Sequence, residues 1–83
     1  MDDRNPAEEL PELYRSVLDV LAKLDRAGER RAAYELRRRA TRIYATRWND
    51  GGRRALQKTL RDAEHQLASS SRAAALGPVG LSA

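Results

Sequence analysis

The sequence predicts an all-α fold, a small antiparallel three-helix hairpin bundle with flexible termini. Apolar residues recur every three or four positions through three successive segments, and short stretches containing glycine separate these segments. The 83 residues suffice for one domain, and such short connections place successive helices side by side and antiparallel. We expect the helices at about residues 11–27, 29–48 and 53–69, forming a single domain over residues 11–69.

The first helix is predicted to begin at Pro11. Asn5-Pro6-Ala7-Glu8 resembles a capping box, but proline inside a helix removes a hydrogen bond and clashes with the preceding turn. We therefore expect only a short turn over residues 6–9, within a flexible acidic N-terminus of residues 1–10. The helix carries one apolar stripe: Leu10, Leu13, Tyr14, Val17, Leu18, Val20, Leu21 and Leu24. Gly28 supplies the left-handed residue that commonly ends a helix.

The second helix carries its apolar stripe at Ala33, Leu36, Ala40 and Ile43. The two alanines allow a neighbouring helix to approach closely, and Leu36 is expected to lie at the centre of the core. Asn49-Asp50-Gly51-Gly52 then interrupts the helix, because two glycines cost about 2 kcal/mol relative to alanine. Asn or Asp in this stretch can cap the helix that follows.

The third helix has a narrow apolar seam at Leu56, Leu60, Ala63 and Leu67. The remaining residues 70–83 mix Ser, Ala, Gly and Pro without periodicity. We expect this tail to be disordered, or helical only as far as Leu76.

Composition excludes several classes of protein. The chain has no cysteine, so it forms no disulfide and no zinc site built on sulfur. The N-terminus lacks the basic and apolar regions of a signal peptide, and no apolar stretch reaches the length of a membrane helix. We predict a cytoplasmic protein with no membrane partner. Arginine makes up 14 of the 16 basic residues, which is typical of a bacterium with a G+C-rich genome.

Positive charge is concentrated in the second half of the chain. Residues 1–28 carry a net charge of −3 and residues 29–83 a net charge of +7. On the second helix Arg31, Arg38 and Arg42 share one exposed line with Glu35, and arginines clustered on a helix are typical of polyanion binding. The alternative is a solvated face with Glu–Arg pairs four residues apart.

A second line on the same helix contains Tyr34, Arg37, Tyr44 and Trp48. Aromatic and arginine side chains together are the usual anchors of a protein interface and can also stack on bases. Alternatively, a central helix contacts two neighbours, so these side chains pack on the first and third helices. If packing does not account for them, a protein partner is favoured over nucleic acid.

Catalytic and metal-binding patterns are absent from the sequence. His65 is the sole histidine, and Asp62 and Glu64 do not share its helical face, so we expect no metal site and no cofactor. Gly51-Gly52 lacks the Lys and Ser or Thr of a phosphate-binding loop. We therefore predict that the protein is not an enzyme.

Two partial resemblances concern the helical hairpin. Residues 18–44 look like one tetratricopeptide hairpin, with Gly28 at the turn, but Arg37 and Leu21 depart from that repeat and no second copy follows. Trp48-Asn49-Asp50-Gly51 resembles the turn of the Trp-x-Gly proteins of bacterial secretion systems, but is one residue longer and lacks their C-terminal tyrosine motif. Both features are general to helical hairpins.

The sequence alone thus favours a non-enzymatic bacterial module for protein–protein interaction, whose partner is another protein or a second copy of the chain. The aromatic line of the second helix and the seam of the third are the expected contact surfaces. The alternative is a small basic nucleic-acid-binding protein that uses the arginine-rich second helix.

Overall fold

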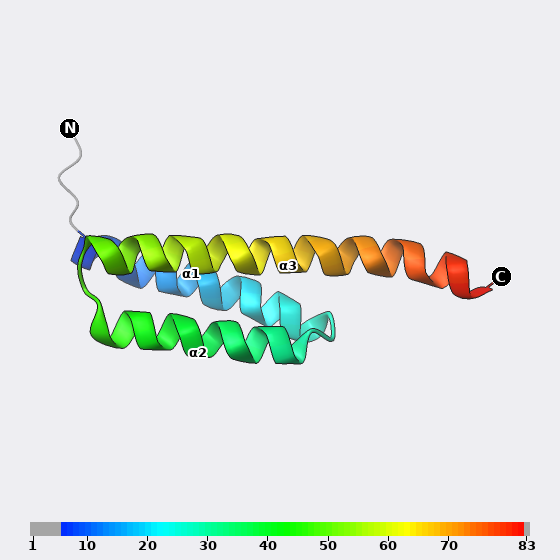
Figure 1. Cartoon of the computed structure of the whole chain (residues 1–83), viewed down its shortest axis with the longest axis horizontal. Helices are drawn as coiled ribbons and strands as arrows, with labels where there is room; N and C mark the ends of the chain where they lie inside the picture. Colours follow the sequence, from blue (N-terminus) through cyan, green and yellow to red (C-terminus); the bar gives the residue numbers. More distant parts are fainter. Residues whose placement is uncertain (1–5, 83) are drawn as a thin grey trace, which may run out of the picture.

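The computed structural model describes residues 6–82, and the side chains of residues 8–72. These residues form three helices in which successive helices run antiparallel and every pair is in contact, which confirms the predicted fold class (Figure 1). The expected flexibility of residues 1–5 lies outside the described residues, as does residue 83. The helices are α1 (Pro6–Arg26), α2 (Arg30–Thr46) and α3 (Asp50–Ser82).

The predicted start of the first helix was wrong, because α1 begins at Pro6 and contains Pro11. Pro11 removes one hydrogen bond and crowds the preceding turn, so the longer helix has a local cost. Two tertiary contacts favour the additional turn. Leu10 is completely buried in the core, which stabilises the fold by about 1.5–3 kcal/mol, and the Glu9 carboxylate lies 3.4 Å from a guanidinium nitrogen of Arg53. Together they outweigh the local cost of the proline.

Gly28 ends α1 as predicted. Its φ of +89° lies in the left-handed region, which side chains other than glycine rarely adopt. The Glu29 N–H donates to the Leu24 carbonyl at 2.9 Å, and the Gly28 N–H donates to the Asp25 carbonyl at 3.1 Å. These two bonds form a Schellman motif, which satisfies carbonyls at the helix end and turns the chain into α2.

Gly28→Ala is expected to lower the free energy of unfolding by about 1 kcal/mol, because alanine is strained in the left-handed conformation. No atom lies within 4 Å of the position that its Cβ would occupy. The loss in the free energy of unfolding would therefore come from backbone strain and not from a clash. Urea unfolding measures the difference. Gly28→Asn is the control and should lose less, since asparagine tolerates this conformation better. Equal losses in both variants would contradict this explanation.

The second connection places glycine where the chain approaches itself closely. Asn49 caps α3, as its Oδ1 accepts the Gly52 N–H at 2.9 Å. The helix begins at Asp50 rather than near Arg53, so both glycines lie in its first turn. Gly52 is buried, and a Cβ on it would lie 1.7 Å from the carbonyl oxygen of Arg47. Gly52 therefore permits this close approach, and neither glycine interrupts the helix.

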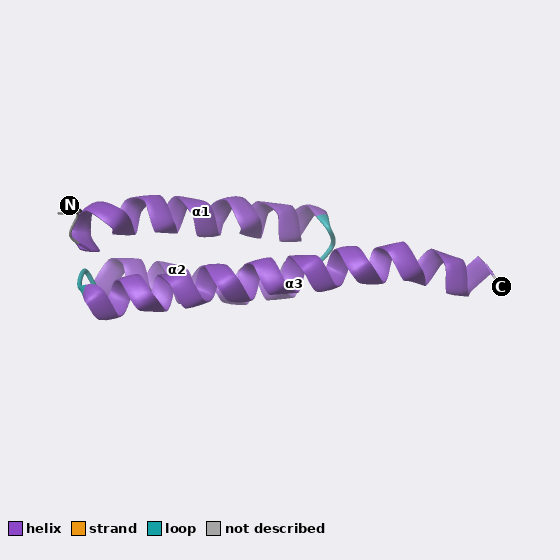
Figure 2. Ribbon diagram, turned by 90° about the horizontal axis from the view of Figure 1, so that it is seen from above, coloured by secondary structure: helices purple, strands orange, loops and turns teal. Residues whose placement is uncertain are grey.

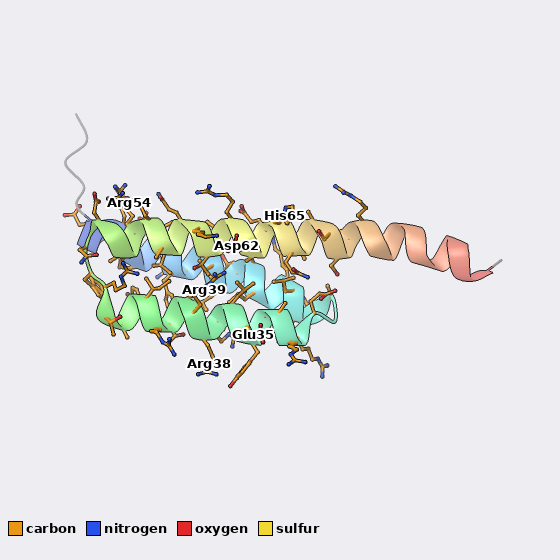
Figure 3. All side chains as sticks on the ribbon, viewed as in Figure 1. Glu35, Arg38, Arg39, Arg54, Asp62 and His65 are labelled. Atoms are coloured by element: carbon orange, nitrogen blue, oxygen red, sulfur yellow. The ribbon has the colours of Figure 1, made fainter. Side chains whose placement is uncertain are left out.

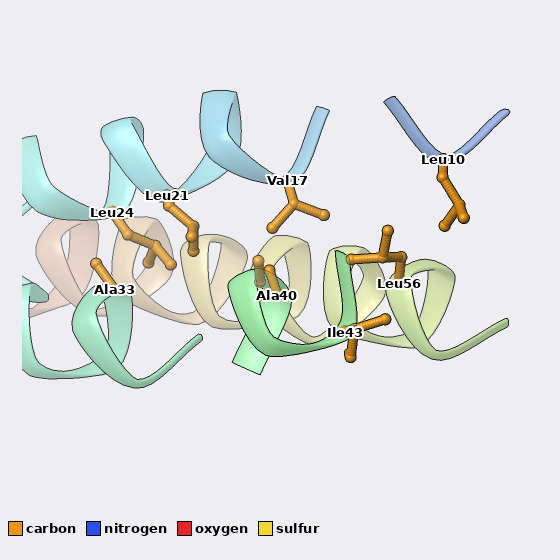
Figure 4. Packing of buried hydrophobic residues seen from close by; sticks show 9 residues of the cluster. Leu10, Val17, Leu21, Leu24, Ala33, Ala40, Ile43 and Leu56 are labelled. Carbon is orange, nitrogen blue, oxygen red and sulfur yellow. The ribbon is translucent and has the colours of Figure 1, made fainter. Parts of the chain in front are cut away.

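The core lies along the axis between the three helices (Figure 4). Leucines and Val17 of α1 pack against alanines and Ile43 of α2 and against Leu56 of α3. Leu36 is only half-buried, so its predicted central position was wrong. It lies beside the core and lines a depression between α2 and α3. The buried apolar residues are Leu10, Val17, Leu21, Leu24, Ala33, Ala40, Ile43, Leu56 and Ala63.

The third helix is longer than its partners and extends past the turn between α1 and α2 (Figures 1 and 2). Its 33 residues span about 50 Å, whereas the 21 residues of α1 span about 32 Å. The helix was expected to end near Ser69 and a disordered tail to follow, but the backbone is helical through Ser82. Alanine and leucine at positions 73–76 are strong helix formers. No helix among the described residues is both long and apolar enough to cross a membrane.

Candidate functional site

The solvent-facing side of α2 carries the three arginines predicted as polyanion contacts. Arg31, Arg38 and Arg42 are all exposed, and Arg38 points away from the bundle (Figure 3). Arg31 Nε lies 3.8 Å from the Glu35 carboxylate, and both side chains are largely exposed. Such a pair contributes little to stability. Arg38 and Arg42 form no ion pair with any described residue.

The predicted aromatic line divides into two parts. The Tyr44 ring stacks on Tyr14 of α1, with centroids 4.3 Å apart and an angle of 2° between the planes. Trp48 also lies against Tyr44, with ring centres 5.0 Å apart and planes tilted by 41°, and its indole N–H donates to the Tyr44 carbonyl. The Tyr14 hydroxyl lies 3.0 Å from the hydroxyl of Thr41. Tyr44 and Trp48 thus pack at the α1–α2 contact, although 47% of Trp48 stays exposed.

Tyr34 lies apart from this stack and is 61% exposed. The guanidinium carbon of Arg38 is 5.9 Å from the centre of its ring, within the range of a cation–π contact. A shallow depression of about 420 Å³ surrounds the pair, and most of its accessible lining is apolar. We call this surface the Tyr34 face. Its lining residues are Tyr34, Arg37, Arg38, Thr41 and Arg42.

The Tyr34 face combines members of both predicted sets. Tyr34 and Arg37 come from the aromatic line, and Arg38 and Arg42 come from the arginine line. Positions 34, 37, 38, 41 and 42 follow the spacing of one helical face, so α2 alone positions them. Arg31 does not line the Tyr34 face; it lies one turn earlier in α2 and pairs with Glu35.

A charged cluster between α2 and α3 was not predicted. An Arg39 nitrogen donates to an Asp62 carboxylate oxygen at 2.9 Å, and Lys58 Nζ donates to the same oxygen at 3.4 Å (Figure 3). Burial by itself would raise the pKa of Asp62, but the hydrogen bonds from Arg39 and Lys58 outweigh it and hold that pKa below its ordinary value. The pair of Lys58 with Asp62 could be predicted, because the two residues are four positions apart on one helix. The pair of Arg39 with Asp62 could not, because no sequence pattern relates these two positions.

Lowering the pH should remove the stabilisation that Asp62 provides. Because its pKa is lower in the folded protein than the ordinary 3.8, the contribution is present above that value and is lost as the pH falls through the folded pKa. The effect is less than about 1 kcal/mol, since both partners are more than a third exposed. Urea unfolding of the wild type and Asp62→Asn should differ at about pH 7 and converge near pH 2. A constant difference would contradict this assignment.

The described residues offer no group of three or more His, Cys, Asp or Glu side chains that could hold a metal ion. His65 is exposed on α3 (Figure 3). The Tyr34 face has arginine, tyrosine and threonine side chains but neither a carboxylate nor a histidine, so it supplies anion and aromatic contacts. No protein family, curated protein or solved structure with which the chain was compared matches it.

Proposed function

We propose that this protein is a non-enzymatic interaction module that binds another protein through the Tyr34 face. The observation that carries the proposal is the position of Tyr34: a large aromatic side chain, 61% exposed, in an apolar depression bordered by three arginines. Tyrosine and arginine, together with tryptophan, are the residues most enriched among interface anchors. The composition supports a bacterial cytoplasm as the setting of this interaction.

The seam of α3 does not serve as the contact surface in this proposal. Leu56 and Ala63 are buried, and Leu60 and Leu67 are packed against the core of the same chain. A partner would have to displace α1 and α2 to reach them. The Tyr34 face requires no such rearrangement, because all five of its residues are already exposed to solvent.

Site-specific photo-crosslinking tests this proposal. A photoreactive phenylalanine analogue replaces Tyr34 in one variant and Arg61, an exposed residue of α3, in the control. We expect discrete protein adducts in the cells of origin from position 34 and none of the same mass from position 61. Adducts that are equal at both positions, or the absence of protein adducts at position 34, would contradict the proposal.

Nucleic-acid binding is the second candidate, and it is favoured by Arg38 and Arg42, which form no ion pair with a described residue. Phosphate contacts weaken steeply as the salt concentration rises, whereas an apolar protein contact does not. Titration with duplex DNA at two salt concentrations, followed by Trp48 fluorescence and by anisotropy of labelled DNA, separates the two. Salt-sensitive binding that Arg38→Gln and Arg42→Gln weaken would favour this candidate over the first.

A further inference from the structure

We infer that the partner of the Tyr34 face is an acidic protein segment that inserts one apolar side chain into the depression and places carboxylates on the surrounding arginines. This inference rests on the proposed function and specifies the partner's chemistry. It follows from three properties of the surface: its apolar lining, its arginines without an ion pair among the described residues, and its length.

The lining of the depression is mostly apolar although three of its five residues are arginines. The Tyr34 ring and the aliphatic parts of the arginine and Thr41 side chains therefore face the depression. Arginine commonly covers apolar surface with its methylene groups while its charged end stays in water. An apolar side chain of a partner would bury this surface, and a fully charged partner would not.

The charges around the depression lack counter-ions within the described part of the chain. Some cations elsewhere in the chain are paired: Arg39 and Lys58 contact Asp62, and Arg53 and Arg54 contact Asp50. Arg37, Arg38 and Arg42 have no such contact with a described residue. Guanidinium groups bind carboxylates in a bidentate manner, so two or three acidic residues of a partner complement this surface.

The size of the surface and the position of Glu35 favour a protein segment over a nucleic acid. Positions 34 to 42 extend over about 12 Å of α2, which matches about two turns of a partner helix. Glu35 lines the adjacent depression together with Arg38 and Arg42, and 68% of its side chain is exposed. A continuous row of phosphates along α2 would pass this carboxylate and be repelled by it. Separate carboxylates of a protein segment can be spaced to avoid it.

The first experiment uses a designed peptide as the probe. The peptide forms about three helical turns and carries a central leucine with glutamates three and four residues on either side. In one matched peptide glutamine replaces every glutamate, and in the other alanine replaces the leucine. Fluorescence anisotropy of each labelled peptide measures binding to the full chain, and a labelled DNA duplex forms the polyanion arm. We expect the glutamate–leucine peptide to bind at least about tenfold more tightly than either matched peptide.

Variants of the protein locate the binding. Tyr34→Ala should weaken the glutamate–leucine peptide about tenfold or more, and Arg42→Gln about threefold or more. Arg61→Gln removes the same charge from an exposed site on α3 and should change the affinity less than about twofold. Both replaced residues of the Tyr34 face are exposed, so circular dichroism and thermal unfolding should show a folded chain for each variant.

Three results would overturn the inference: peptide binding unchanged by Tyr34→Ala, equal binding of the glutamine-substituted peptide, or DNA bound more tightly than the peptide with the same dependence on Arg42. The crosslinking experiment distinguishes this failure from failure of the proposed function. If position 34 forms protein adducts but the peptide does not bind, the Tyr34 face remains the proposed interaction surface and the acidic partner is rejected. If position 34 forms no protein adducts and the peptide does not bind, the proposed function and the acidic partner are both rejected.

Discussion

Gly52→Ala is expected to destabilise the fold by about 3 kcal/mol or more. The added Cβ would lie 1.7 Å from the Arg47 carbonyl oxygen and 2.9 Å from the Arg47 Cβ. Both contacts are with the chain that leads out of α2, so relief requires the backbone of the connection to move. Such movement disturbs the Asn49 cap as well as the packing of α3, which adds the loss of a cap to the cost of overpacking.

Gly51→Ala is the matched control for this prediction. Its Cβ would lie 3.1 Å from a terminal nitrogen of the Arg47 side chain, which is flexible and can move away. Alanine also favours the helical conformation by up to about 1 kcal/mol relative to glycine. Gly51→Ala should therefore leave the free energy of unfolding unchanged or raise it. Urea unfolding followed by circular dichroism measures both variants, and equal losses would show that the close approach at Gly52 is not responsible.

Leu21→Ala is expected to cost about 2–5 kcal/mol, because Leu21 is completely buried near the middle of α1. A chain of this length is typically stable by about 4–12 kcal/mol, so the variant loses much of its stability. Thermal unfolding should show a large drop in the transition temperature.

Leu36→Ala removes the same atoms from a half-buried position and should cost about 1–2 kcal/mol. The contrast between Leu21 and Leu36 tests where the core lies. If Leu36→Ala were as destabilising as Leu21→Ala, the core would extend further toward the α2–α3 contact than the structure shows.

Local chemistry explains which helix boundaries could be predicted. The left-handed preference of Gly28 and the capping side chain of Asn49 act within a few residues, so the sequence contains the whole interaction. Pro11 and the glycine pair were interpreted as interruptions because their local costs are known. Leu10 offsets the cost of Pro11 by entering a core built from all three helices, which the sequence does not place together. The close approach of Gly52 to Arg47 depends on the path of the backbone between α2 and α3, which residue preferences do not give.

The same reasoning applies to the candidate site. Helical periodicity correctly identified Arg38 and Arg42 as exposed, since one face of α2 must meet water. It could not separate Tyr34 from Tyr44, because that difference depends on where α1 lies. Tyr14 of α1 stacks on Tyr44, whereas no described aromatic ring stacks on Tyr34. Which aromatic residue remains available to a partner is therefore a tertiary property.

The contacts among Tyr14, Tyr44 and Trp48 allow the intrinsic fluorescence of the protein to report on the packing of α1 against α2. It contains two of the three tyrosines and the single tryptophan, with neighbouring ring centres 4.3 and 5.0 Å apart. At such separations, excitation energy absorbed by the tyrosines is transferred to the indole, and Trp48 emits the fluorescence. Separation of α1 from α2 would move Tyr14 away from the indole and restore part of the tyrosine emission, whereas Tyr44 would stay beside Trp48. The docking of these two helices can thus be followed in the unlabelled wild-type protein.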